Sequence, residues 1–292
     1  MPLCYTRDEK RRRGEDDMQK SIFFCEIQHL SGMAEGEFDS TFAALKSLGI
    51  DGFQFSNRDI EKAGEARLRA ALARHGMRAD IIHIVIPLLS KEDAVFRAAC
   101  QKAKDTVALL QRFSCRRLMI VALPVSDVAG EDDRERAMSR MIEGLSEIVG
   151  AASAAEIEVY IENFSKPLLP YSAVEDIERI MDALPQIRYA FDVGNFICVG
   201  EDPFRAYARL RPRVSLFHLK NFTPTDDGRG ILCADGHRVE GVAFDRGEFD
   251  MLAFLRAAST EGGRIHPVIE HNANIPLSEI ARSAALVDRL LI

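Results

Sequence analysis

The sequence predicts an α/β protein built as a single (β/α)8 TIM barrel. Eight strand-length apolar runs alternate with eight segments of helical periodicity, and this alternation is typical of parallel βα units that close into a barrel. The length of 292 residues suits one such barrel, which commonly needs ~250 residues. A doubly wound open sheet is the competing fold, but it normally carries a GxGxxG loop after an early strand, and the sequence contains none.

The individual elements follow from local composition, taken in chain order. The apolar runs are rich in Ile, Val and Phe, and we expect strands at 21–27, 51–55, 79–86, 117–123, 157–162, 187–193, 214–219 and 265–270. Helical patterns lie near 37–48, 59–75, 91–113, 131–155, 173–184, 202–211, 248–261 and 277–291. Several helix ends carry a recognisable signal: a capping box at Ser172-Ala-Val-Glu175, Pro203 at a first helical position, and Gly49 and Gly76 after helix ends.

The first 17 residues differ in character from the rest of the chain. Their charge is dense and they have no apolar periodicity, so we expect a disordered leader at 1–17 before a barrel at 18–292. Met18 stands directly before the first predicted strand and is an alternative start.

The longest predicted connection, 221–247, is rich in Asp, Gly, Thr and Arg. In a barrel it would lie on the catalytic face, where a long polar loop is either a substrate cover or a tolerated surface insertion. Its residues Arg229, Arg238 and Arg246 are candidates for a phosphate cradle.

Bulk composition narrows the class of function. The hydrophobic content of 47% and the charged content of 28% are ordinary for a soluble globular protein. A net charge of −7 argues against a nucleic-acid partner, because phosphate binding needs a surplus of Lys and Arg. The six cysteines have no CxxC spacing, which suits reduced thiols in a cytoplasm. No apolar run approaches the ~18 residues of a membrane span.

Four consecutive predicted strands end on a residue that can bind a metal or transfer a proton. They deliver Glu162, Asp192, His218 and Glu270, and a sharp turn is expected at Gly194, just after Asp192. Side chains alternate along a strand, and the apolar neighbours of these four residues suit the face toward the helices. The residues two positions earlier should share the inward face, and they are Tyr160, Ala190, Leu216 and Val268. All four should therefore point into the barrel at the carboxyl ends of the strands, where barrel enzymes keep their active sites.

A lone acidic residue at a strand end usually caps a turn, but four such residues at equivalent positions favour one shared site. Three carboxylates and an imidazole in one barrel mouth repel one another and lose hydration, so they need a counter-charge. We expect a single divalent cation to supply it. Oxygen ligands with one imidazole favour Mn²⁺ or Mg²⁺, with Co²⁺ and Zn²⁺ as alternatives, and they exclude a cysteine-rich structural zinc.

Further polar residues near the predicted strand ends are candidates for contact with a substrate. Lys220 shares a face with His218 and is either a stabiliser of a developing oxyanion or a surface lysine at a strand exit. Asn163, Asn195 and Asn272 either orient substrate hydroxyls or form turns.

Three residues near the first and third predicted strands are also candidates. His83 falls on the inner face if the isoleucines beside it face helices, and it then reaches the pocket unless it is a core histidine. His29 follows the first strand, and Glu26 is expected to point inward near the pocket floor.

The segments Ile-Glu162-Asn, Phe-Asp192-Val-Gly-Asn, Phe-His218-Leu-Lys220-Asn and Val-Ile-Glu270 resemble the xylose-isomerase-like superfamily of TIM barrels, in particular its sugar phosphate isomerase/epimerase group. The resemblance covers residues 20–292. It implies one divalent metal ion held by Glu162, Asp192, His218 and Glu270. It does not identify a substrate, because these barrels reuse one site for isomerases, epimerases, dehydratases and nucleases.

The chemistry of such a site favours proton transfer next to a carbonyl. A metal that chelates a ketone oxygen and the neighbouring hydroxyl acidifies the C–H between them and stabilises the enediolate. Glu162 and Glu270 come from non-adjacent strands, so one could remove the proton and the other return it, as the resemblance to ketose epimerases implies. We therefore expect an isomerase or epimerase of a sugar, a sugar phosphate or another small polyhydroxy ketone. The oligomeric state is left open, and a homo-oligomer is one option.

Two positions depart from the ketose 3-epimerase pattern and keep other functions open. Asn195 stands where those enzymes usually have His, and Pro224 stands where an Arg is expected. The alternative is a dehydratase of a cyclic polyhydroxy ketone, of the inosose or dehydroshikimate type. An endonuclease IV-type AP endonuclease is disfavoured because it also needs a histidine at position 195, and Asp235-Gly-His237 is better explained as a turn than as that family's Asp-x-His pair. A barrel that has lost catalysis is the remaining alternative.

Overall fold

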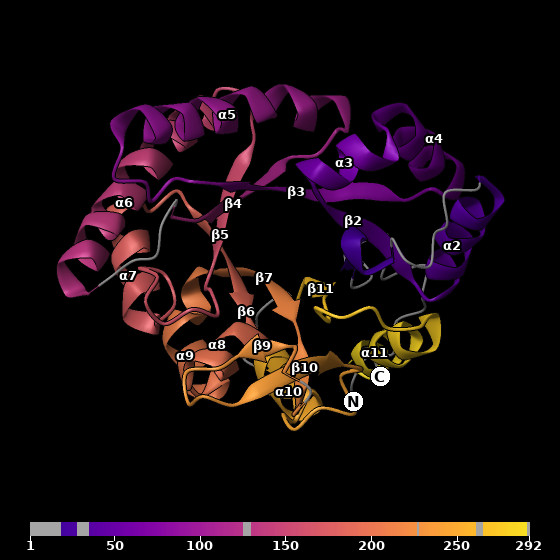
Figure 1. Ribbon diagram of the computed structural model, residues 1–292. Coiled ribbons are helices and arrows are strands. Elements are labelled where there is room, and N and C mark those ends of the chain that lie inside the picture. Colours follow the sequence, from indigo (N-terminus) through magenta and orange to yellow (C-terminus); the bar gives the residue numbers. More distant parts are fainter. Residues whose placement is uncertain (1–18, 28–34, 125–129, 227, 261–264, 291–292) are drawn as a thin grey trace, which may run out of the picture.

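Eight parallel strands close into one barrel, and helices surround it (Figure 1). The computed structural model describes residues 19–27, 35–124, 130–226, 228–260 and 265–290. The predicted leader at 1–17, Met18 and His29 lie outside these residues. The strand order around the barrel is β1-β11-β7-β6-β5-β4-β3-β2, with every neighbouring pair parallel. The predicted fold class is therefore confirmed.

The barrel strands have between three and nine residues. They are β1 Lys20–Phe23, β2 Ile50–Ser56, β3 Arg78–Ile86, β4 Arg117–Ala122, β5 Glu158–Glu162, β6 Arg188–Asp192, β7 Val214–Leu219 and β11 Pro267–Ile269. The helices are α2 Glu35–Ser47, α3 Asn57–Ala63, α4 Glu65–His75, α5 Asp93–Arg112, α6 Glu131–Ser153, α7 Val174–Ala183, α8 Val193–Val199, α9 Pro203–Leu210, α10 Met251–Thr260 and α11 Leu277–Asp288, with 3₁₀ turns η1 Phe24–Ile27 and η2 Arg211–Arg213. Among the described residues, no helix has both the length and the apolar character that crossing a membrane requires.

The observed boundaries correct several predicted elements. The strand expected at 21–27 ends at Phe23, and η1 occupies its second half. The helix expected at 59–75 is broken by Gly64, whose φ of 88° is a conformation that glycine adopts without strain. The capping box is shifted by one residue, because Asp176 rather than Glu175 accepts the backbone N–H groups of Ser172 and Ala173. Pro203 at the start of α9 is confirmed.

Helix α8 was not predicted, and it changes the role of Gly194. Asp192 ends β6 and caps α8 by accepting the backbone N–H of Asn195 at 2.8 Å. Gly194 therefore lies inside a helix rather than at a sharp turn. A Cβ atom at this position would lie 2.6 Å from Lys220 Cβ and 2.6 Å from Phe222 Cε2, so glycine is required for close approach.

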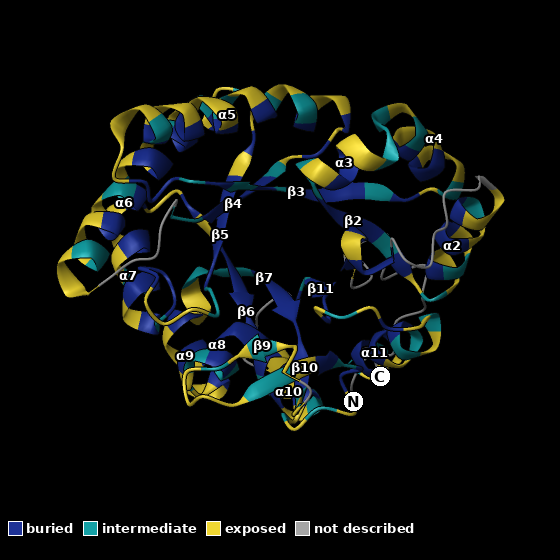
Figure 2. Ribbon diagram, viewed as in Figure 1, coloured by how far each residue is buried: buried dark blue, intermediate teal, exposed yellow. Residues whose placement is uncertain are grey.

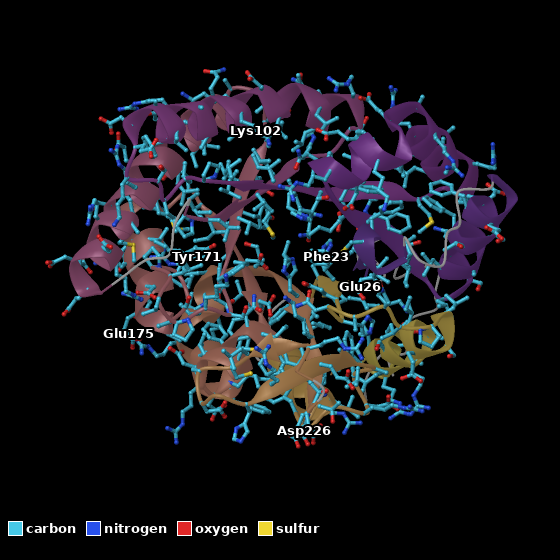
Figure 3. All side chains as sticks on the ribbon, in the orientation of Figure 1. Phe23, Glu26, Lys102, Tyr171, Glu175 and Asp226 are labelled. Atoms are coloured by element: carbon cyan, nitrogen blue, oxygen red, sulfur yellow. The ribbon has the colours of Figure 1, made fainter. Side chains whose placement is uncertain are left out.

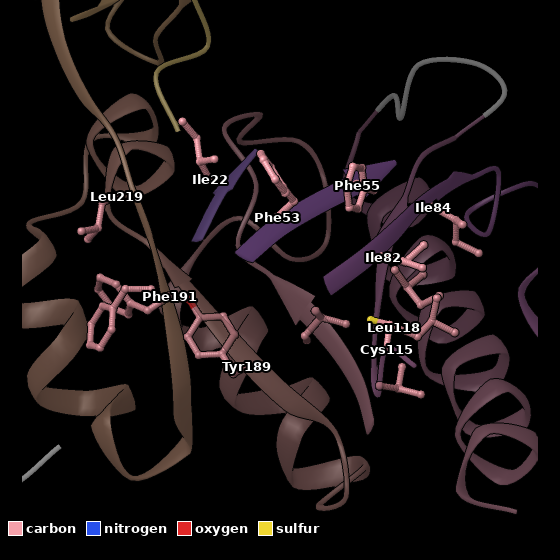
Figure 4. Close-up of a cluster of buried hydrophobic side chains, with 14 of the residues drawn as sticks. Ile22, Phe53, Phe55, Ile82, Ile84, Cys115, Leu118, Tyr189, Phe191 and Leu219 are labelled. Atoms are coloured by element: carbon pink, nitrogen blue, oxygen red, sulfur yellow. The ribbon is translucent and has the colours of Figure 1, made fainter. Parts of the chain in front are cut away.

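Two layers of buried side chains follow from strand alternation. The side chains of Phe23, Ile81, Met119, Tyr160, Ala190, Leu216 and Val268 form a cluster inside the barrel. Residues of the opposite face pack between the strands and the helices, as the close-up shows for Phe53, Ile82 and Phe191 (Figure 4). The strands are dark blue and the outer helix faces yellow in Figure 2, which gives the same division. The predicted inward positions of Tyr160, Ala190, Leu216 and Val268 are confirmed.

The long connection 221–247 contains a small antiparallel sheet with the order β8-β10-β9, made of β8 Asn221–Pro224, β9 Ile231–Leu232 and β10 Arg238–Val242. A Cβ at Gly241 would come 1.4 Å from the carbonyl oxygen of His271, so β10 packs directly on the chain beyond β11. Two of the arginines proposed for a phosphate cradle have other partners. Arg238 donates to the carbonyl of Gly230, and Arg246 pairs with Glu279.

Candidate metal centre and active site

The four predicted acid and imidazole side chains meet at the carboxyl ends of their strands. His218 Nδ1 lies 2.7 Å from Glu162 Oε2, 3.7 Å from Asp192 Oδ2 and 3.9 Å from Glu270 Oε2. Glu162 and Asp192 are the last residues of β5 and β6, and Glu270 follows β11 directly. One imidazole nitrogen therefore faces three carboxylates from three different strands.

Lys220 belongs to the same cluster. Its ammonium group lies 2.8 Å from Asp192 Oδ2 and 2.9 Å from Glu270 Oε1, and it is 3.4 Å from Asn195 Oδ1. The side chain is only 5% exposed, so the alternative of a surface lysine is wrong. A second positive charge thus stands beside the carboxylates inside the barrel mouth.

Burial and charge act in opposite directions on these groups. Burial disfavours protonation of His218, but the neighbouring carboxylates outweigh it and raise the His218 pKa to about 9. Burial raises the pKa of Glu270 to about 8, although Lys220 opposes this shift. For Asp192 burial also favours the neutral acid, but Lys220 and His218 outweigh burial and lower the Asp192 pKa. Within one cluster, the pKa of Asp192 is therefore lowered while that of Glu270 is raised.

The cluster fits a divalent cation. Glu162, Asp192 and His218 each present one ligand atom, and these three atoms lie within 4.8 Å of one another. Asp192 Oδ2 and Glu270 Oε2 are buried and accept no well-aligned hydrogen bond, although Asp192 Oδ2 is ion-paired with Lys220. Buried oxygens with unused lone pairs are costly, and a cation would satisfy them. Glu270 lies outside the three-residue group, at the edge of the cluster.

Gln54 on β2 is a member of the site that the sequence did not single out. Its Oε1 lies 2.9 Å from His218 Nε2, and its amide nitrogen faces His83 Nδ1 at 3.4 Å. An amide oxygen can only accept, so His218 Nε2 must carry the hydrogen. The raised pKa of His218 means that Nδ1 also carries a hydrogen, which it donates to Glu162 Oε2; loss of this hydrogen would free a lone pair on Nδ1 for a cation. The sequence pattern that could have indicated Gln54 is Phe53-Gln54-Phe55. One polar residue stands there between two phenylalanines that are buried against the helices, so Gln54 points to the inner face.

The asparagines have different positions in the site. Asn163 is fully buried: its Oδ1 accepts from the Tyr189 hydroxyl at 2.7 Å and from the Asp192 N–H, and its amide donates to the Asp192 carbonyl. These contacts favour a role in fixing Asp192 over the predicted contact with substrate. Asn195 bonds to the backbone of Asn163, lines the pocket and faces Lys220. Asn272 is exposed at the rim with a left-handed φ of 56°, so it both forms a turn and lines the pocket.

His83 lines the pocket, as predicted for an inner-face residue of β3. Burial lowers its pKa to about 4, so the ring is neutral at neutral pH. Phe23, which Figure 3 labels near the middle of the barrel, packs against the rings of both His83 and His218.

Glu26 does not lie on the pocket floor. It accepts from the Asn272 N–H at 2.9 Å, and its other oxygen lies 3.2 Å from His271 Nδ1. His271 Nε2 in turn lies 2.9 Å from the hydroxyl of Ser283 on α11. All three side chains are buried, so this chain of hydrogen bonds fixes the backbone that follows Glu270.

Side chains at the carboxyl ends of the strands surround a pocket of about 330 Å³, which we call the catalytic pocket. Its polar wall contains Gln54, His83, Glu162, Asn195, Lys220 and Glu270. The volume suits a small molecule. Among these groups, a bound carbonyl compound would meet two glutamates, one lysine and three neutral polar side chains, which suits acid–base chemistry.

The closed parallel barrel, with an acid–imidazole cluster at the carboxyl ends of its strands, places the protein in the class of TIM barrels. A model of the xylose isomerase-like TIM barrel family matches residues 42–286, and the chain belongs to that family. None of the curated proteins matches the sequence significantly.

Solved structures with the same fold have low sequence identity to this chain. A xylose isomerase-like TIM barrel protein from Mycobacterium smegmatis in complex with magnesium has a TM-score of 0.65 and 16% identity, covering 90% of this chain and 90% of that chain. The probable 3-DHS dehydratase AsbF from Bacillus anthracis has a TM-score of 0.70 and 13% identity, covering 92% and 98%. A D-psicose 3-epimerase from Clostridium cellulolyticum H10 has a TM-score of 0.70 and 12% identity, covering 94% and 98%.

Proposed function

We propose that the protein is a divalent-metal-dependent isomerase or epimerase that moves a proton next to the carbonyl of a sugar, a sugar phosphate or another polyhydroxy ketone. The observation that carries this proposal is the convergence of Glu162, Asp192, His218, Lys220 and Glu270 at the carboxyl end of the barrel. Such a set combines ligands for a cation with proton-transfer groups in one buried pocket.

Glu162, Asp192, His218 and Glu270 would hold the ion, which we propose to be Mn²⁺ or Mg²⁺, with Co²⁺ and Zn²⁺ as alternatives. When bound, a divalent cation polarises a carbonyl oxygen and acidifies the adjacent C–H bond. The buried oxygens of Asp192 and Glu270 that accept no well-aligned hydrogen bond support this assignment, as does the bound magnesium of the Mycobacterium smegmatis structure.

The protein's own groups divide the remaining work. Glu162 on β5 and Glu270 after β11 are separated by β6 and β7, so they approach a bound molecule from different sides. One accepts the proton from carbon and the other returns one. Lys220 stabilises negative charge that develops on a substrate oxygen, and Asn195, held by Asn163, orients a hydroxyl. His83 and Asn272 are proposed to contact the substrate from the opposite wall and from the rim.

A dehydratase of a cyclic polyhydroxy ketone is the second candidate. The position where ketose 3-epimerases usually have a histidine holds Asn195, whose amide is bonded to the Asn163 backbone. The resemblance of the fold to a probable 3-DHS dehydratase also supports this alternative. Loss of a hydroxyl needs the same base, with Lys220 or the second glutamate assisting the leaving group.

We also propose that the protein works in a reducing cytoplasm without a nucleic-acid or membrane partner. Its described cysteines, including buried Cys100, Cys115 and Cys198, are free thiols, which suits this setting.

Metal analysis and substrate screening test the proposed function. We expect one divalent ion for each chain after incubation with Mn²⁺ and removal of excess metal. A panel of ketoses, ketose phosphates, inososes and dehydroshikimate-like acids in deuterated solvent should include a compound that gains deuterium next to its carbonyl. A protein that binds no stoichiometric metal, or that exchanges no compound of the panel, would contradict the proposal.

A further inference from the structure

A second cavity, of about 830 Å³, opens beside the catalytic pocket. The two cavities share four lining residues, Leu123, Phe164, Ser165 and Asn272. The larger cavity, which we call the apolar cavity, therefore adjoins the pocket where Glu162, Lys220 and Glu270 meet. A substrate that extends beyond the smaller pocket on this side must enter it.

The apolar cavity is built from three segments that the barrel brings together. Leu123 and Pro124 follow β4, Phe164 to Leu169 follow β5, and Ile231 and Leu232 form β9 of the small sheet. Its polar lining among the described residues is limited to the rim residues Ser165, Lys166, Cys233 and Asn272, of which Lys166 and Asn272 are exposed. The cavity thus offers a bound molecule few hydrogen-bonding partners.

Two leucines of this cavity are exposed to an unusual degree. Leu168 is 59% exposed and Leu232 is 55% exposed, and among the described residues only Phe204 is a further large apolar side chain of comparable exposure. They come from segments far apart in the sequence and line the same cavity. Clustered apolar exposure next to a polar site is typical of a surface that a ligand covers.

The catalytic pocket is more polar than the apolar cavity. Gln54, Asp59 and His83 line it together with the acid–base groups, so a hydroxy-carbonyl head finds hydrogen-bonding partners there. Its apolar lining includes Leu123 and Phe164, and these two residues also line the apolar cavity. The polar character of the lining therefore decreases from the catalytic pocket toward the apolar cavity.

We propose that the substrate is amphipathic: a hydroxy-carbonyl head binds among Glu162, Lys220 and Glu270, and an aryl or alkyl substituent occupies the apolar cavity. This inference rests on the proposed proton-transfer function and specifies its substrate class. Because the two cavities adjoin, one molecule that carries both head and substituent can occupy both of them.

Small 1-hydroxy-2-ketones with a common head test this inference. Binding to the Mn²⁺-loaded protein is measured by calorimetry for hydroxyacetone, erythrulose, 1-hydroxyhexan-2-one and 1-hydroxy-4-phenylbutan-2-one. Affinity should rise about threefold to fourfold for each methylene group that becomes buried, so the phenyl compound should bind at least about tenfold more tightly than hydroxyacetone or erythrulose. Equal affinities for the whole series, or tightest binding of erythrulose, would overturn the inference.

Substitutions in the apolar cavity test whether its leucines cause the gain in affinity. Leu168→Asn and Leu232→Asn should each reduce the advantage of the phenyl compound severalfold and leave binding of hydroxyacetone unchanged. Phe204→Asn is the matched control, because Phe204 is an exposed apolar residue that lines neither cavity. If the two leucine variants instead convert a dimer into a monomer and keep the full advantage, the leucines serve self-association and the inference is wrong.

Solvent-deuterium exchange separates failure of the inference from failure of the proposed function. Exchange into hydroxyacetone without any gain from apolar substituents would leave the function standing and remove the amphipathic substrate. A gain from apolar substituents without exchange into any ketone would refute the proton-transfer function, and with it the substrate class proposed here.

Discussion

His218 uses its two ring nitrogens for different partners. Nε2 donates to Gln54, and Nδ1 faces Glu162 at 2.7 Å. A histidine that ligates a metal usually has its other nitrogen hydrogen-bonded, because that bond fixes the tautomer and the orientation of the ring. Gln54 meets this requirement from the opposite side of the barrel, 164 positions away in the sequence.

We therefore expect Gln54→Ala to weaken metal binding by about 10-fold to 100-fold, the range seen when such supporting partners are lost. Gln54→Glu keeps a hydrogen-bond acceptor and should lose less. His218→Ala, which removes a ligand, is the positive control and should lose at least as much as Gln54→Ala. Titration against a chelating dye measures the affinity, and imidazole ¹⁵N shifts report the tautomer. Unchanged shifts and unchanged affinity in Gln54→Ala would contradict the assigned role.

Metal binding should depend on pH because protons compete for the same atoms. In the metal-free site the carboxylates raise the pKa of His218 to about 9 against the effect of burial, and burial raises that of Glu270 to about 8. A raised pKa means that both groups hold protons at neutral pH and must release them to bind a cation. The apparent affinity should therefore increase from pH 6 to pH 9, by up to about tenfold per pH unit for each displaced proton. The dye titration repeated at four pH values measures this slope, and a flat profile would show that neither group loses a proton on binding.

At the scale of elements, strand alternation accounts for what the sequence predicted well. The inward set Tyr160, Ala190, Leu216 and Val268 and the meeting of four strand ends both follow from a period of two residues in parallel strands. Contacts between distant strands were not predictable in the same way. The bond of Gln54 to His218 depends on the register of β2 relative to β7, and local pattern contains no information about that register.

The local sequence pattern also failed to predict the shortest elements. Helix α8 has seven residues and starts directly on Asp192, so its sequence has too few turns to show helical periodicity. The small sheet of β8, β9 and β10 was read as irregular because its strands are short and rich in polar residues. Its position depends on the close contact of Gly241 with the backbone of His271.

Gly241→Ala should consequently destabilise the protein and disturb the site. The new Cβ would overlap the carbonyl oxygen of His271, so the backbone next to Glu270 must shift, and overpacking of this kind costs about 1–3 kcal/mol. Gly150→Ala on α6 is the control, because a Cβ there meets nothing within 4 Å and alanine favours the helix. Thermal unfolding and metal affinity of both variants check this prediction. Equal melting temperatures of the two variants would mean that β10 is not in close contact with the backbone of His271.

At the scale of the whole molecule, the two ends of the barrel have different tasks. The site lies at the carboxyl ends of the strands, and an ionic cluster lies toward the amino ends. There Asp80 on β3 lies 2.7 Å from the Ser21 hydroxyl and 2.5 Å from His266 Nε2, and it also pairs with Arg117. Ser21 on β1 and His266 beside β11 flank the seam where the barrel closes. Polar clusters at this end of a barrel serve stability rather than catalysis.

Asp80→Asn should therefore lower the free energy of unfolding by about 1–3 kcal/mol at pH 7, because the partly buried Arg117 and His266 would lose the buried carboxylate that they share. Burial alone would raise the pKa of Asp80, but His266 and the arginines outweigh it and lower the pKa below its ordinary value of 3.8. A lowered folded pKa stabilises the fold above the unfolded value, and this stabilisation is lost as the pH falls below about 4. Urea unfolding at pH 7 and pH 3 should show a smaller difference between wild type and variant in acid. Asp182→Asn, at an exposed ion pair with Arg213, should change stability by less than about 1 kcal/mol at either pH.

The central claim is that two glutamates from non-adjacent strands transfer protons at one cation site. Solvent-deuterium exchange by Glu162→Gln and Glu270→Gln, saturated with Mn²⁺ and given the ketone that the wild type turns over best, tests it most directly. Glutamine keeps an oxygen for the ion but cannot accept a proton at neutral pH, so each variant should retain metal and lose turnover by about 10²-fold to 10⁴-fold. One of them should still exchange the hydrogen next to the carbonyl, which identifies the surviving glutamate as the base for that face. If both variants turn over the ketone within a few-fold of wild type, the two-glutamate account is wrong.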